Sequence, residues 1–72
     1  MELHNKELQR AIVKSNSFEV EAKTTETGEL VIRAKIDDDI HANYVYFSES
    51  ERDSDIKQIE QYIREMENFR FM

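Results

Sequence analysis

The segments FEVEAKT at residues 18–24 and ELVIRAKI at residues 29–36 contain the pattern from which the fold is predicted. In both segments apolar side chains alternate with polar or charged ones, which is the period-two pattern of a strand with one buried face. Residues 24–28 separate them and end in Gly28, the only glycine of the chain. Because glycine adopts positive φ without strain, these residues predict a turn. The sequence therefore predicts two neighbouring antiparallel strands.

A third strand is predicted over residues 43–47, Asn-Tyr-Val-Tyr-Phe. The three aspartates at residues 37–39 end the second strand, because Asp is depleted in strands and favours turns. Both sets of side chains in the third strand are apolar or aromatic, so the alternation does not decide which set is buried. We expect Val45 and Phe47 to point inward and the two tyrosines to point outward.

Two helices flank the strands. The first is predicted over about residues 2–14 and the second over about residues 53–68, since apolar side chains recur there with the helical period. Ser48 and Glu51 have the spacing of a capping box ahead of the second helix. The apolar stripe of the first helix consists of Met1, Leu8, Ala11 and Ile12, with His4 in the same arc; that of the second consists of Ile56, Ile59, Tyr62, Ile63, Met66 and Phe69.

These elements predict a single small α+β domain covering residues 1–72, with the order α-β-β-β-α. The simplest architecture is a three-stranded antiparallel meander with both helices on one face of the sheet. No repeat, low-complexity tract or Pro/Gly linker indicates a second domain. The opposite face of the sheet is expected to be solvated.

The charge of the chain is concentrated in one segment. Its 72 residues include 16 acidic and 10 basic side chains, for a net charge of −6. Residues 37–55 hold seven acids against one base, Arg52, and so account for the whole excess. An acidic balance argues against direct binding of nucleic acid or of an anionic membrane.

The acidic segment divides into two groups at opposite ends of the third predicted strand. Such groups match separated basic sites on a nucleic-acid-binding protein, because arginine binds carboxylate and phosphate with the same bidentate fork. Turn chemistry and the helix dipole are a structural alternative for the same residues. The candidate partner-binding residues are Asp37, Asp38, Asp39, Glu49, Glu51, Asp53 and Asp55.

The residue inventory argues against an enzyme. The chain has two histidines and no cysteine, so thiol chemistry is excluded and a reducing compartment is expected. His41, beside the Asp triplet, is the one acid–base candidate. Counted from Asp37, the sixth position of an EF-hand loop is Ala42 rather than Gly, and the twelfth is Ser48 rather than Glu. We predict no catalytic residue, no metal site and no cofactor, and no apolar run is long enough to span a membrane.

Residues 29–33 and 43–51 also resemble part of a known family. Glu-Leu-Val-Ile-Arg, the acidic loop at residues 37–39 and Asn-Tyr-Val-Tyr-Phe-Ser-Glu-Ser-Glu are similar to one region of small acidic phage-encoded anti-CRISPR proteins. Those proteins inhibit the guide-RNA-directed nuclease of type II-A systems. The resemblance implies that Asp37, Asp38 and Asp39 enter the groove in which arginines read the short duplex motif beside the target.

The leading hypothesis is thus a non-enzymatic acidic inhibitor, or DNA mimic, from a phage or mobile element. Its partner would be a CRISPR-type nuclease or another basic nucleic-acid-processing protein. The alternative is a small homodimeric or partner-binding module that uses the open sheet face, with the acids serving only solubility. The alternative interface residues are Val31, Tyr44 and Tyr46.

Overall fold

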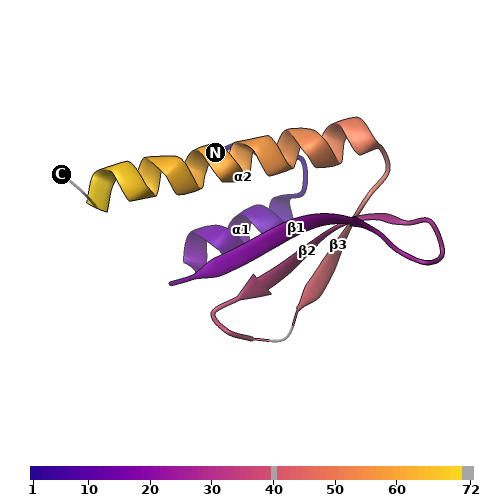
Figure 1. The fold of residues 1–72 in the computed structure, drawn as a ribbon, viewed down its shortest axis with the longest axis horizontal. Helices are drawn as coiled ribbons and strands as arrows, with labels where there is room; N and C mark the ends of the chain where they lie inside the picture. The colour runs from indigo at the N-terminus through magenta and orange to yellow at the C-terminus, as the bar shows by residue number, and fades with distance from the viewer. Residues whose placement is uncertain (40, 71–72) are drawn as a thin grey trace.

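The computed structural model describes residues 1–39 and 41–70, with only the backbone described for residues 67–70. The chain forms a small α+β domain in which a three-stranded antiparallel meander lies between two helices in the sequence (Figure 1). The predicted element order is confirmed. In chain order the elements are α1 (Lys6–Lys14), β1 (Phe18–Thr24), β2 (Leu30–Ile36), β3 (Ala42–Tyr46) and α2 (Glu49–Arg70).

The central strand β2 pairs with β1 on one side and with β3 on the other. The turn between β1 and β2 lies where Gly28 predicts it. Gly28 has a φ of +87°, and the Thr25 N–H donates to the Glu29 carbonyl at 2.9 Å. Glycine is required there because a side chain disfavours this backbone conformation.

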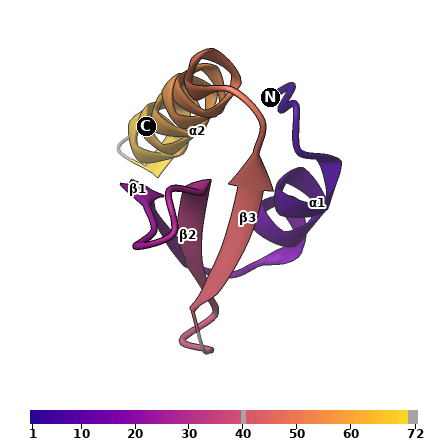
Figure 2. The ribbon, with the colours of Figure 1, turned by 90° about the vertical axis from the view of Figure 1, so that its right-hand side faces the viewer.

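Both helices contribute to one core on a single face of the sheet. Leu8 and Ile12 of α1 are buried together with Ile59 of α2, and they pack with residues of β2 and β3. Figure 2 shows α2 along one side of the sheet and α1 beside β3. The buried sheet residues of this core are Ile32, Ala34 and Tyr46.

The first helix begins later than predicted, at Lys6 rather than near residue 2. Its N-cap is Asn5, whose side-chain oxygen accepts the Leu8 N–H at 3.0 Å. This hydrogen bond satisfies one of the free N–H groups of the first turn. The preceding residues are therefore outside the helix, although Leu3 is still buried in the core.

The second helix begins earlier than predicted, at Glu49 rather than Asp53. Ser48 caps it, since its Oγ accepts the Glu51 N–H at 3.2 Å and its carbonyl accepts the Arg52 N–H at 3.2 Å. The predicted apolar residue Phe69 lies outside the residues whose side chains are described. Within the described part of the chain, no helix combines the length and apolarity that a membrane span needs.

The predicted facing of the third strand is wrong. Tyr46 is buried and Tyr44 packs against the core, whereas Val45 is half-exposed and Phe47 is 97% exposed. In the observed register Tyr44 lies opposite Ile32 and Tyr46 opposite Leu30. Paired residues share a face, so both tyrosines lie on the inner face.

Candidate functional site

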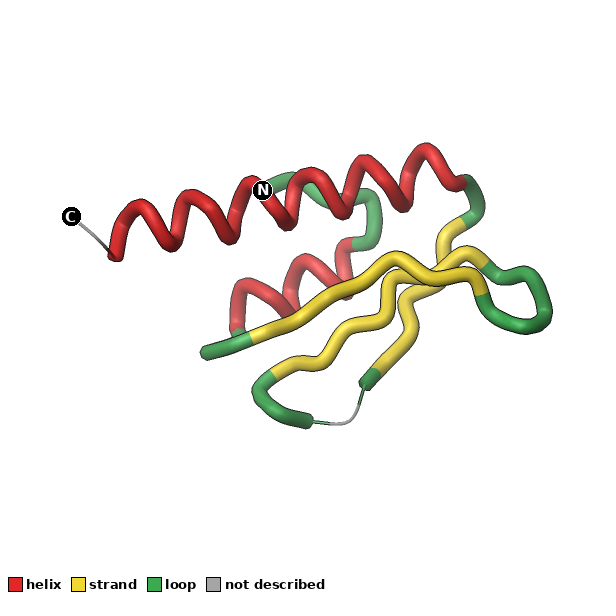
Figure 3. The backbone as a smooth tube through the Cα atoms, viewed as in Figure 1, coloured by secondary structure: helices red, strands yellow, loops and turns green. Residues whose placement is uncertain are grey.

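The acidic residues lie at the two ends of β3, as the meander requires. Residues 37–39 follow β2 and lead toward the start of β3, whereas Glu49, Glu51 and Asp53 lie in the first turns of α2, directly after β3. Figure 3 shows the loop between β2 and β3 and the start of α2 at opposite ends of the strand. We call residues 37–39 the loop end, and Glu49, Glu51 and Asp53 the helix end.

At the loop end, Asp37 forms hydrogen bonds with the backbone of residues 16 and 17. Its Oδ1 accepts the N–H groups of Asn16 and Ser17 at 2.7 and 3.0 Å, and its own N–H donates to the Ser17 carbonyl at 2.9 Å. Its φ is +52°, a left-handed conformation that Asp tolerates better than most residues. Asp37 therefore fastens the loop to the connection between α1 and β1.

Asp38 and Asp39 present their side chains more openly. Asp38 has a φ of +62°, and its side chain is 93% exposed, with Lys35 Nζ at 3.9 Å from a carboxylate oxygen. The Asp39 N–H donates to the Ile36 carbonyl at 2.9 Å, which closes a turn with positive φ at both central positions. This is the pattern of a type I′ turn, and it projects the Asp38 carboxylate into solvent.

At the helix end, the buried Arg52 is surrounded by acids. Its Nη1 donates to the Lys23 carbonyl at 2.9 Å, which ties the start of α2 to the end of β1. Its guanidinium also lies 3.6 Å from Glu49 Oε1 and 3.4 Å from Asp53 Oδ1. Only 8% of Arg52 is exposed, whereas both acids extend into solvent, so the exposed charge here is negative.

Two further acids lie at the same end of the sheet as the helix end, and they were not among the site residues predicted from the sequence. Glu26 and Glu29 lie in or beside the β1–β2 turn and are exposed. In an antiparallel meander the first turn and the end of the third strand lie at the same end of the sheet. The Arg52 contact to Lys23 brings α2 to that end as well. The predicted strand order already implies this arrangement, so Glu26 and Glu29 could have been predicted to lie at this end of the sheet.

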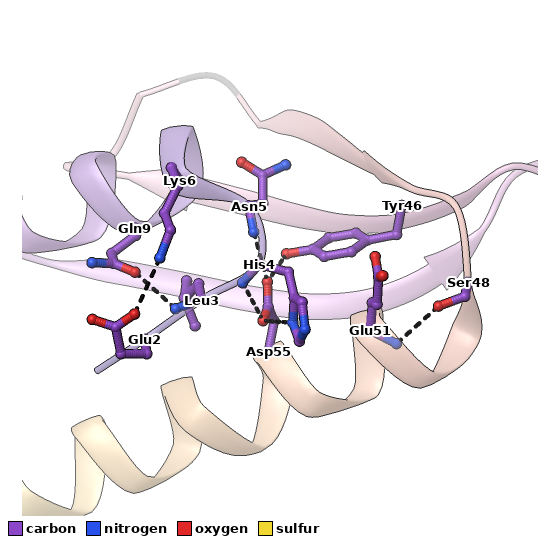
Figure 4. A network of polar contacts seen from close by, with 10 residues as sticks. All are labelled: Glu2, Leu3, His4, Asn5, Lys6, Gln9, Tyr46, Ser48, Glu51 and Asp55. Atoms are coloured by element: carbon purple, nitrogen blue, oxygen red, sulfur yellow. Dashed lines mark hydrogen bonds and ion pairs between the residues drawn. The ribbon is translucent and has the colours of Figure 1, made fainter.

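Asp55 does not belong to the exposed acidic surface. It is 0% exposed and accepts hydrogen bonds from the backbone N–H groups of His4 and Asn5 at 2.8 and 3.1 Å. The Tyr46 hydroxyl donates to it at 2.5 Å, and His4 Nδ1 lies 3.0 Å away (Figure 4). The carboxylate joins α2, β3 and the N-terminal segment, which is a structural role.

This network alters the pKa of both partners. Burial raises the pKa of Asp55, but the hydrogen bonds from Tyr46, His4 and Asn5 outweigh it and hold that pKa below its usual value. Burial and the adjacent carboxylate both raise the pKa of the Tyr46 hydroxyl well above its usual value. Asp55 is therefore a buried carboxylate stabilised in its charged form, and Tyr46 remains a donor.

The residues of the alternative interface do not form an exposed patch. Val31 is 2% exposed on the outer face, where its register neighbours are Lys23 and Val45. Tyr46 is buried and its hydroxyl donates a hydrogen bond to Asp55, and Tyr44 is half-buried on the inner face. The exposed apolar side chains of β3 and the residue after it are instead Val45 and Phe47.

The histidines are separated in the structure. His4 contacts Asp55, whereas His41 is exposed near Glu19, Glu21 and Arg33 on the outer face of the sheet. Among the described residues, no group of three or more His, Asp or Glu side chains is placed to hold a metal ion.

The fold and the site define a small acidic α+β domain with exposed carboxylates at both ends of an edge strand. Among the proteins compared with this chain, no family model, no curated protein and no solved structure matches it.

Proposed function

We propose that this protein is a non-enzymatic inhibitor that binds the basic nucleic-acid groove of a nucleic-acid-processing protein through its two acidic ends. The main support for the proposal is that the fold uses some of the acidic side chains for internal contacts and leaves others exposed at the two ends of β3. Asp55 is buried, and Asp37, which is exposed, accepts two backbone N–H groups; Asp38, Asp39, Glu49, Glu51 and Asp53 are also exposed. The acids that remain exposed still lie in two groups at opposite ends of one strand.

The arrangement suits a groove that normally holds a phosphate backbone. Such a groove carries arginine and lysine side chains at intervals, and carboxylates can satisfy the same donors. Glu26 and Glu29 widen the helix end on the side of β1. The domain would occupy the groove and exclude nucleic acid by competition, which requires no catalytic group.

The resemblance to anti-CRISPR proteins suggests a particular class of target protein that can be tested. On that basis the target is the guide-RNA-loaded type II-A nuclease, the source is a phage or mobile element, and the site of action is the cytoplasm of a bacterial host. The loop end would then lie among the arginines that read the duplex motif beside the target. Asp38 and Asp39 would make this contact, with Asp37 holding the loop in place.

A cleavage assay with this nuclease and a matching DNA duplex tests the proposal. Titration of the wild-type protein is expected to stop cleavage, with inhibition weakening as salt increases. Two double variants probe the two ends: Asp38→Asn with Asp39→Asn, and Glu49→Gln with Asp53→Asn. Each is expected to weaken inhibition about tenfold or more, because each leaves basic groups of the target without partners.

The double variant Glu60→Gln with Glu65→Gln is the matched control, since both residues are exposed on α2 beyond the helix end. It removes the same charge and is expected to inhibit like the wild type. Equally weakened inhibition by all three double variants would show that net charge alone acts, and undiminished inhibition by the first two would overturn the acidic ends as the binding surface. Undiminished cleavage at saturating wild-type protein would overturn the type II-A nuclease as target.

A further inference from the structure

Within the described residues, no strand pairs with the edge of β3 that faces away from β2. β3 is at the end of the strand order, and within the described residues its backbone makes no hydrogen bond to any element other than β2. Natural proteins usually protect such an edge with charged side chains or proline. β3 has neither, since its sequence is Ala-Asn-Tyr-Val-Tyr.

A groove of about 400 Å³ lies at the carboxyl end of β3. One wall is formed by residues 4–7 at the start of α1, and the other by residues 45–47. Val45 and Tyr46 point to opposite faces of the sheet, yet both line the groove. The groove therefore reaches both faces of the sheet at that end of the strand. Figure 2 shows the start of α1 beside β3, on the side away from β2.

The charges around the groove favour a basic occupant. Lys6 is paired with Glu2 at 3.3 Å, whereas Glu7 and Glu51, which also line the groove, have no ion pair among the described residues. Figure 4 shows Glu51 beside Tyr46 at the end of β3. The exposed side chains of Val45 and Phe47 add apolar surface next to these carboxylates.

We propose that the β3 edge binds an extended basic segment of the partner protein, which adds to the sheet as a fourth strand. The backbone of β3 would supply the hydrogen bonds, Val45 and Phe47 would contact alternate apolar side chains, and Glu7 and Glu51 would pair with lysine or arginine. This inference rests on the proposed function, in which the partner is a basic protein.

The same charges disfavour a second copy of the chain as the occupant. Antiparallel pairing of two β3 strands would place the helix end of one copy beside the loop end of the other, both acidic. Parallel pairing would place like ends together. Either orientation brings carboxylates near carboxylates, which is unfavourable.

Binding of a synthetic peptide tests the site directly. The probe is a peptide of about six residues in which lysine and valine alternate, a length typical of a strand. It is expected to bind one to one and to slow hydrogen exchange of backbone amides within residues 42–46. The double variant Glu7→Gln with Glu51→Gln is expected to weaken peptide binding about tenfold. Addition of Phe47→Ser to this double variant is expected to weaken binding further without loss of the fold.

Two controls separate strand addition from charge attraction. A peptide of the same sequence, methylated at every backbone nitrogen, keeps its charge but has no backbone N–H on either edge, cannot pair as a strand and is expected not to bind. The Glu60→Gln, Glu65→Gln protein is expected to bind like the wild type. Equal binding of the methylated peptide, or protection confined to other elements, would overturn the site. Protection of β3 that rises with protein concentration, without peptide, would assign the edge to a second copy and also overturn it.

The two proposals can fail separately. Peptide protection of β3 without inhibition of the nuclease would keep the strand-addition site and overturn the type II-A nuclease as its partner. Inhibition that depends on Asp38 and Asp39, without any peptide protection, would keep the inhibitor and overturn the strand-addition site.

Discussion

The Tyr46 hydroxyl donates a hydrogen bond of 2.5 Å to the Asp55 carboxylate, and both side chains are buried. The other oxygen of Asp55 accepts the His4 N–H, so one carboxylate connects β3, α2 and the segment before α1. A buried charge is tolerated only when hydrogen bonds replace its hydration. The stability of the domain therefore depends on this small network.

Removal of the Tyr46 hydroxyl should destabilise the fold. Tyr46→Phe keeps the ring but deprives Asp55 of a donor, and we expect the free energy of unfolding to fall by about 1.5–3 kcal/mol. Tyr44→Phe is the matched control, because no hydrogen bond of the Tyr44 hydroxyl is present among the described residues, and it should change stability by less than about 0.5 kcal/mol. Urea denaturation of both variants measures the difference. Equal effects would contradict a specific role for the Tyr46–Asp55 bond.

Stability should fall in acid because of Asp55. Its pKa is lowered in the folded state, so it stabilises the fold above the unfolded-state value of about 4. That contribution is lost as the pH falls through the lower folded-state pKa. Asp55→Asn should therefore be less stable than the wild type at neutral pH, and the gap should narrow in acid. Denaturation at a series of pH values measures it, and a constant gap would contradict the prediction.

Asp37 should matter through its hydrogen bonds and not through its charge. Asp37→Asn retains an oxygen acceptor and tolerates positive φ, so it should change stability little. Asp37→Ala removes the acceptor for the Asn16 and Ser17 N–H groups and should cost about 1–3 kcal/mol. Thermal or urea unfolding distinguishes them. A large loss in the Asn variant as well would show that the negative charge itself is needed.

Arg52 should hold α2 to the sheet. Arg52→Met keeps much of the buried aliphatic volume but removes the donor to the Lys23 carbonyl, with an expected cost of about 1.5–3 kcal/mol. Arg64→Met on the exposed part of the same helix is the control for loss of positive charge. Urea denaturation compares the two. Similar stability of both variants would indicate that the Lys23 contact is dispensable.

The site residues were only partly predictable. Ser48 and Glu51 had the spacing of a helix cap, and the meander placed the two acidic groups at opposite ends of β3. The internal use of Asp37 and Asp55 was not visible in the sequence, because their hydrogen-bond partners are distant along the chain. Asp37 bonds residues 20 and 21 positions earlier, and Asp55 bonds His4, 51 positions earlier.

The order of elements and the course of the sheet follow from local patterns in the sequence. Polar–apolar alternation in residues 18–24 and 29–36, with Gly28 between them, is a local signal that needs no tertiary contact. Which side chains of residues 43–47 are buried depends on tertiary contacts, because both faces of that strand are apolar or aromatic in the sequence. Tyr46 can be buried because its hydroxyl donates a hydrogen bond to Asp55 of α2. The spacing of apolar residues in the sequence does not predict a hydrogen bond between two different elements.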